Sequence, residues 1–297
     1  LIQNHPTSPY IPRALLNKGL VHYNLEQLDY AKNDLETVVL KFSRDLAAQQ
    51  ALTTLREIAI EEGSTAAFRQ FVQTHQISSI SEVELAQTAF IAAEKYYLDN
   101  RTKQAQKLLV DYIVTYPNNP NTLTAKFYLA ELYYEQEDWS NALDIYREIG
   151  FLPINEYTEK ALVKAAIAAT NTPEKEAAIP LWRRLDSIAS FEENKRYAQF
   201  NLMKAAYETQ IYEEAKTRSQ QIITYPDLDP KIKWDAYDIL AHSALKVGDS
   251  IQAQAAFLAL ENAPDDVRAA EALFFKATLQ AQRGDFAGSN TTIASIS

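Results

Sequence analysis

The chain has 297 residues, a formal net charge of −10 at pH 7 and no cysteine. The acidic balance argues against nucleic-acid binding, which needs a basic face, and the lack of cysteine excludes disulfides, thiol catalysis and cysteine-based zinc sites, although it does not fix the compartment. No apolar run approaches the ~20 residues of a membrane-spanning helix and no signal peptide is recognisable, so we expect no direct membrane insertion.

The first residues resemble the end of a helix and the loop that follows it. Residues 1–9 are similar to 112–117, where an expected helix runs into a proline. At the other end, 291–297 stops inside an expected helix, without the polar capping helix that repeat arrays normally carry. We therefore expect 1–11 to be the remnant of a preceding repeat and 12–297 to be a continuous array cut from a longer one. A natural chain with ragged ends is the alternative.

Eight times along the chain a small residue recurs, and a bulky apolar residue usually follows four positions later. The successive spacings are 36, 38, 37, 36, 37, 38 and 36 residues. A period this regular is typical of a solenoid, in which each repeat packs only on its neighbours. The eight marks are Ala31, Ala67, Ala105, Ala142, Ala178, Ala215, Ala253 and Ser289.

Further residues in register with the marks predict two antiparallel helices in each repeat. A second small residue lies twelve positions upstream in six repeats, a tyrosine lies eight upstream in four, and prolines separate several repeats. Small residues let helix backbones approach closely, and prolines end helices. Leu55 and Met203 replace the second small residue in repeats two and six, and Pro180 predicts a kink or a late start of the second helix in repeat five.

The most regular repeat, 127–146, reads FYLAELYYEQEDWSNALDIY and resembles the tetratricopeptide repeat (TPR) family. The resemblance covers essentially the whole chain, with repeats a few residues longer than the family norm. It implies an all-α fold, a right-handed α-solenoid of about eight TPR-like helix pairs. The expected repeats are approximately 12–44, 45–80, 81–120, 121–155, 156–191, 192–230, 231–266 and 267–297.

Some short segments are also similar to the long periplasmic TPR proteins of Bacteroidota envelopes, of the Tol-Pal-associated or outer-membrane assembly-like kind. These segments are 116–120 with 125–131, 192–195 and 269–273. The resemblance implies a periplasmic or outer-membrane-associated location. A cytoplasmic location is the alternative.

The sequence points to no catalytic residue. The four histidines fall in different repeats, at His5, His22, His75 and His242. Residues two repeats apart are about 20 Å distant at ~10 Å per helix layer, so the histidines cannot share a metal or acid–base site. No nucleophile elbow, phosphate loop or dinucleotide fingerprint is recognisable. We therefore expect a protein that is not an enzyme and that holds no metal and no cofactor.

In TPR arrays, the first helix of each pair lines the concave face. The resemblance implies that this face carries a row of aromatic side chains with carboxylates between them, which we call the ladder. Such a face suits a protein or peptide partner with apolar anchors and Lys or Arg between them. The alternative is that the phenylalanines and Tyr97 are packing between neighbouring helices. The candidate partner-binding residues are Phe90, Glu94, Tyr97, Phe127, Glu131, Tyr134, Tyr197, Phe200, Tyr207 and Asp238.

Two classes of function remain open at this point. The first is a non-enzymatic protein–protein interaction scaffold in the bacterial cell envelope. The second is a recruiting or regulatory arm of an enzyme whose catalytic domain lies outside this sequence. TPR domains that capture chaperone C-terminal carboxylates line the same face with Lys, Arg and Asn, whereas here the positions are mainly acidic, aromatic or aliphatic, so that kind of clamp is not expected.

Overall fold

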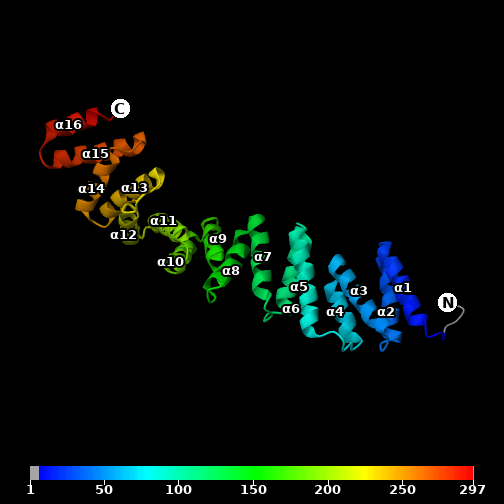
Figure 1. The fold of residues 1–297 in the computed structure, drawn as a ribbon. Coiled ribbons are helices and arrows are strands. Elements are labelled where there is room, and N and C mark those ends of the chain that lie inside the picture. The colour runs from blue at the N-terminus through cyan, green and yellow to red at the C-terminus, as the bar shows by residue number, and fades with distance from the viewer. Residues whose placement is uncertain (1–6, 297) are drawn as a thin grey trace. The chain divides into compact units, whose positions relative to one another are not determined.

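The computed structural model describes residues 7–296, and every regular element in that range is helical (Figure 1). The chain divides into two compact units, Leu1–Glu135 and Gln136–Ser297. The all-α repeat fold that the periodicity predicts is confirmed. Of the expected remnant at 1–11, residues 1–6 lie outside the described range.

The first unit contains seven of the described helices, and the second contains nine together with one short 3-10 helix. Helices that follow one another along the chain pack together within each unit, and α11 also packs on α13. In the first unit the helices are α1 (Ile11–Asn24), α2 (Leu28–Lys41), α3 (Leu46–Glu62), α4 (Thr65–Thr74), α5 (Glu82–Leu98), α6 (Thr102–Thr115) and α7 (Thr122–Glu135). In the second they are α8 (Trp139–Phe151), α9 (Thr158–Thr170), η1 (Lys175–Ala177), α10 (Ala178–Ile188), α11 (Glu192–Glu208), α12 (Tyr212–Ile222), α13 (Pro230–Lys246), α14 (Ser250–Leu260), α15 (Asp266–Gln282) and α16 (Phe286–Ala294).

The small residues that mark the period lie at close helix contacts. Seven of the eight marks are buried, and bulky residues four positions later, such as Leu35, Leu109 and Trp182, are buried beside them. Burial of the bulky side chains supplies the hydrophobic stabilisation, and a small neighbour lets the helices come close enough to achieve it. The buried marks are Ala31, Ala105, Ala142, Ala178, Ala215, Ala253 and Ser289.

The turn between the two helices of a pair has the same backbone conformation in six repeats. A residue with positive φ lies five positions before the mark, and in four of these repeats it is not glycine. The left-handed conformation ends the first helix and turns the chain toward the second. The six residues are Glu26, Asn100, Glu137, Gln210, Gly248 and Gly284.

In repeat two the predicted register is wrong by one residue. Ala67 is exposed, whereas Phe68 and Val72 of α4 are buried. The left-handed residue of this repeat is Gly63, which lies five positions before Phe68 rather than before Ala67. Phe68 therefore occupies the position that a small residue holds elsewhere, and Leu55 of α3 is buried in the same cluster.

Pro180 produces the late start that the sequence left open as one of two outcomes. The first turn of the second helix in repeat five is the 3-10 helix η1, and α10 begins at Ala178, two residues before the proline. Proline is tolerated there because the amide groups of a helix's first turn have no partner within the helix.

None of the described helices combines the length and the apolar character that crossing a bilayer requires.

Candidate binding site

In the first unit, two of the predicted ladder phenylalanines are interior packing. Phe90 and Phe127 are only 6% and 5% exposed, and Glu131 is 7% exposed. The Phe90 ring lies against the ring of Tyr112, with a centroid distance of 5.5 Å. These side chains fill the space between helices, which is the alternative that the sequence left open, so they offer no surface to a partner.

The other predicted residues of the first unit are half-buried, and two of them, Glu94 and Tyr97, contact Tyr128. Tyr97 stacks on Tyr128 with a centroid distance of 4.3 Å, and the Tyr128 hydroxyl donates to Glu94 Oε1 at 3.2 Å. Burial, and after it the Glu131 carboxylate, raises the pKa of Tyr97. Tyr134 is half-buried as well.

In the second unit, the predicted residues reach solvent. Tyr197 is 43% exposed, and Phe200, Tyr207 and Asp238 are half-buried. The Tyr197 ring meets the buried ring of Trp182 edge to face at 5.6 Å, which fixes its position without covering it. Among the predicted aromatic residues, Tyr197 is thus the exposed one, whereas Phe200 and Tyr207 are half-buried as Tyr97 and Tyr134 are.

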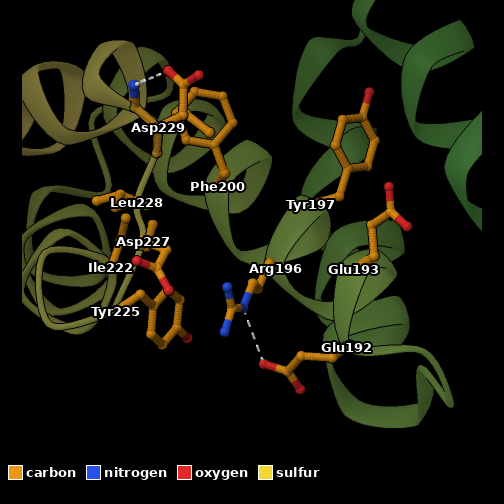
Figure 2. Close-up of a pocket in the computed structure, with 11 residues that line it drawn as sticks. Glu192, Glu193, Arg196, Tyr197, Phe200, Ile222, Tyr225, Asp227, Leu228 and Asp229 are labelled. Carbon is orange, nitrogen blue, oxygen red and sulfur yellow. Dashed lines mark hydrogen bonds and ion pairs between the residues drawn. The ribbon is translucent and has the colours of Figure 1, made fainter.

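A pocket of about 540 Å³ lies beside the start of α11, and we call it the α11 pocket. Tyr197 and Phe200 of α11 line it together with Tyr225 and Leu228 from the end of repeat six, and Tyr225 and Leu228 lie on the side away from Tyr197 (Figure 2). Ile222 and Ile232 complete an apolar lining. The volume falls within the range of sites that hold a small ligand or a side chain of a partner.

The Tyr225 wall is fixed by a chain of hydrogen bonds that reaches three helices. The Tyr225 hydroxyl donates to Gln199 Oε1, and Gln199 Nε2 donates to Asp186 Oδ1 at 2.8 Å. Arg218 Nη1 donates to the other oxygen of Asp186 at 2.7 Å. Burial raises the pKa of Tyr225, so the phenol stays protonated and keeps its donor. A wall held in this way exists before a partner arrives, which reduces the cost of binding.

Carboxylates surround the mouth of the pocket. Glu192, Glu193, Asp227 and Asp229 all line it, and the one cationic lining residue is Arg196. Arg196 is already engaged, because its Nε lies 3.3 Å from Glu192 Oε1 and its guanidinium lies 5.2 Å from the centre of the Tyr225 ring (Figure 2). The remaining excess of negative charge favours a partner with a cationic group beside its apolar part.

The same pocket recurs at the same repeat position. A second pocket of about 540 Å³, the α9 pocket, lies beside the start of α9, and eight of its eleven lining residues stand 37 positions before residues that line the α11 pocket. A smaller pocket of about 190 Å³ lies in the first unit and is lined by Leu52, Ser79 and Ile80. These residues stand 148 positions, or four periods of 37, before Phe200, Asp227 and Leu228. Corresponding residues of the α9 and α11 pockets include Glu156 and Glu193, Val163 and Phe200, Ile188 and Tyr225, and Phe191 and Leu228.

One group of side chains among the described residues could offer three ligands to a metal ion: Asp238 and His242 of α13 with Glu271 of α15. His242 Nδ1 lies 2.9 Å from the Asp238 carbonyl oxygen and 3.2 Å from Asp238 Oδ1, and His242 Nε2 lies 2.9 Å from Glu271 Oε1. The side-chain contact with Asp238 is the largest of the effects that raise the pKa of His242 to about 9. Both ring nitrogens thus face oxygens and carry protons at neutral pH.

A neighbouring arginine completes this group as an ion-pair network. Arg268 of α15 lies 2.6 Å from Asp235 Oδ1 and 3.8 Å from Asp238 Oδ2. A cation already beside Asp238 and a proton on each nitrogen of His242 make ion pairing a better account than metal ligation. The group contains a single histidine, so the spacing of the histidines from one another does not indicate it. The sequence signal is the four-residue spacing of Asp238 and His242 on a helix that precedes Glu271.

The described helices define a helical repeat protein, and the α11 pocket is a cavity on the surface of its second unit. Residues 124–150 match the family model described as tetratricopeptide repeat. This match supports the TPR assignment, and it falls on the repeat with the most regular sequence. A search of the curated proteins found no match.

Solved structures of low sequence identity are similar to the chain. One is a tetratricopeptide repeat protein from Parabacteroides merdae, 13% identical over 96% of this chain and 91% of that one, with a TM-score of 0.33. Another is a signal transduction ATPase with numerous domains and a tetratricopeptide repeat sensor, from Pyrococcus horikoshii, 15% identical over 98% of this chain and 50% of that one, with a TM-score of 0.42. A third is the apo quorum sensor NprR from B. thuringiensis, 11% identical over 96% of this chain and 97% of that one, with a TM-score of 0.34.

Proposed function

We propose that the protein is a non-enzymatic scaffold that binds protein or peptide partners through the first helices of its repeats. The observation that carries this proposal is the α11 pocket, where Tyr197 and Phe200 of a first helix line an apolar cavity with a carboxylate rim. The pocket supplies an apolar floor and negative charge, and neither nucleophile activation nor a cofactor is needed for a function of this kind.

The partner that fits is a segment with a large apolar side chain next to Lys or Arg. Full burial of such a side chain contributes about 1.5 to 3 kcal/mol. Charges at the rim act mainly on the association rate and on the choice of partner. The apolar anchor therefore provides most of the affinity, and Glu193 and Asp227, both exposed, favour the basic neighbour.

A defined peptide tests the proposal directly. The probe is a fluorescein-labelled peptide with one phenylalanine between lysines, and its binding is followed by fluorescence anisotropy. Tyr197→Ala should weaken binding, whereas Tyr10→Ala, which removes an exposed tyrosine of the first unit, should leave it unchanged. Circular dichroism checks that both variants keep their helicity. Equal affinity of the folded Tyr197→Ala variant and the wild type would reject the α11 pocket as the binding site.

We also propose a periplasmic, outer-membrane-associated location for the protein. The support is the resemblance of 116–120, 192–195 and 269–273 to envelope TPR proteins. The test is immunodetection in periplasmic, membrane and cytoplasmic fractions of the source organism, and recovery in the cytoplasmic fraction alone would reject the location.

A further inference from the structure

We propose that the α9 and α11 pockets act together on one extended, basic segment that carries two large apolar side chains three residues apart. This inference rests on the proposed function and adds to it a ligand spacing and a second site. It starts from the observation that most residues lining the α9 pocket stand one period, 37 residues, before residues that line the α11 pocket.

The start of α11 separates the two pockets and contributes to both. Phe191 and Asn194 line the α9 pocket, and Tyr197 and Phe200 line the α11 pocket. Hydrogen bonds fix the beginning of α11 to α9, because the Ser190 amide donates to Glu159 Oε1 at 2.7 Å and Asn194 Nδ2 donates to Glu159 Oε2 at 2.5 Å. The pockets are thus neighbours that share the start of α11.

The distance between the pockets sets the spacing of the anchors in the ligand. Packed helices lie roughly 8 to 10 Å apart. A polyproline II segment rises about 3.1 Å per residue and returns to the same side every third residue, which brings side chains i and i+3 about 9 Å apart on one face. A β-strand would direct side chains i and i+3 to opposite faces. A polyproline II-like segment therefore matches two successive pockets.

Charge determines what flanks the anchors. The two pockets are lined by six carboxylates and two cationic side chains, Lys160 and Arg196. The carboxylates are Glu156, Glu159, Glu192, Glu193, Asp227 and Asp229. A segment with lysine or arginine around its anchors would neutralise this excess, whereas an acidic segment would be repelled.

The two pockets differ in the size of the side chain that they accept most readily. Val163 and Lys160 of the α9 pocket stand where the α11 pocket has Phe200 and Tyr197. The apolar surface of the α9 pocket comes instead from Ile154 and Phe191, both 69% exposed. The α11 pocket is therefore the primary anchor site, and the α9 pocket strengthens binding only for a segment that reaches it.

Three labelled peptides of equal length and charge, on one lysine- and proline-containing frame, test the inference with the full chain. The first has phenylalanines at i and i+3, the second has them at i and i+5, and the third has a single phenylalanine. Linking two binding events in one ligand raises affinity through effective concentration, so the first should bind roughly tenfold tighter than the other two.

The matched variants are Phe191→Ser, which changes the α9 pocket, and Ile251→Ser, which removes an apolar side chain 84% exposed elsewhere in the same unit. Serine is favourable before the first turn of α11, so Phe191→Ser should fold. We expect it to abolish the advantage of the i, i+3 peptide and to leave the single-anchor peptide unaffected, and Ile251→Ser to change neither.

If all three peptides bind equally well, or if Phe191→Ser affects none of them, the pockets do not act together and this inference fails, while the α11 pocket remains a binding site. If none of the peptides binds, the proposed function fails with it.

Discussion

Raising the pH through about 9 should weaken the packing of α15 on α13. His242 of α13 then loses its charge and with it the ion pair to Glu271 of α15. Its contacts are Asp238 on its own helix and Glu271 on α15, and Arg268 of α15 faces Asp235 and Asp238 from the other side. The Tyr207 ring lies 6.5 Å away, and burial raises the pKa of this tyrosine above its ordinary value. As the pH rises through about 9, His242 changes from a charged to a neutral side chain.

The size of the effect follows from the pKa of His242. The hydrogen bond with Asp238 is the largest effect that raises it from 6.5 to about 9, against an opposing effect of burial. A folded-state pKa above the unfolded value means that protonation stabilises the fold, so the contribution is complete below pH 6.5 and disappears as the pH rises through about 9. A shift of this size corresponds to roughly 3 kcal/mol at most, and because the side chain is 25% exposed, solvent screening reduces the expected value to about 1 to 2 kcal/mol.

Hydrogen exchange of peptides from α13 and α15, in the wild type and in His242→Gln, measures this contribution. Glutamine keeps a hydrogen-bond donor and cannot titrate, and comparison at one pH removes the intrinsic pH dependence of exchange. At pH 6 the wild type should be more protected by about 1 to 2 kcal/mol, and at pH 10 the two proteins should be equally protected. A difference that is the same at both pH values would refute the assignment of the proton to His242.

Three further outcomes are expected. Phe68→Ala should lower the free energy of unfolding by about 3 kcal/mol or more in urea titrations, whereas Ala67→Ser should change it by less than about 0.5 kcal/mol. A larger effect of Ala67→Ser than of Phe68→Ala would show that Ala67, and not Phe68, occupies the buried position of repeat two. Phe127→Ala should lower the free energy of unfolding by about 3 to 5 kcal/mol. If the variant kept the stability of the wild type and bound a peptide more weakly, Phe127 would be a residue that contacts the partner. Glu193→Gln combined with Asp227→Asn should reduce the salt dependence of binding to a lysine-rich peptide, as anisotropy at two salt concentrations would detect, and an unchanged salt slope would place the basic group elsewhere.

The period and the helix pairs could be predicted from the sequence, because they depend on residues that repeat at fixed intervals. The error in repeat two shows the limit of this reasoning. Ala67 and Phe68 are adjacent, and both fit a helical pattern. The choice between them depends on the length of the turn at Gly63, which is a backbone property. The pattern of small residues therefore favours Ala67 as the mark, although Phe68 occupies that place in the structure.

The availability of the ladder residues could not be predicted from the first helices alone. Phe90 and Phe200 hold the same position in repeats three and six, yet Phe90 is buried and Phe200 lines a pocket. Tyr112 of the second helix covers Phe90, whereas the corresponding residue of repeat six is Ile222. The size of this residue does not decide the outcome by itself, because Phe127 is buried although an isoleucine, Ile149, stands at the same position of repeat four. The exposure of a first-helix phenylalanine therefore depends on how several neighbouring helices pack around it, which the pattern of a single helix does not reveal.

The left-handed turn that six repeats share allows whole repeats to be gained or lost. Gln210 and Gly248 have the same kind of backbone conformation, and each is followed by the second helix of its pair. Deletion of 211–248 would join α11 directly to Asp249 and α14, and the chain would leave the turn in the direction that it takes now. Gene duplication or loss between two such points can thus add or remove a whole pair of helices without a new connection between the remaining ones.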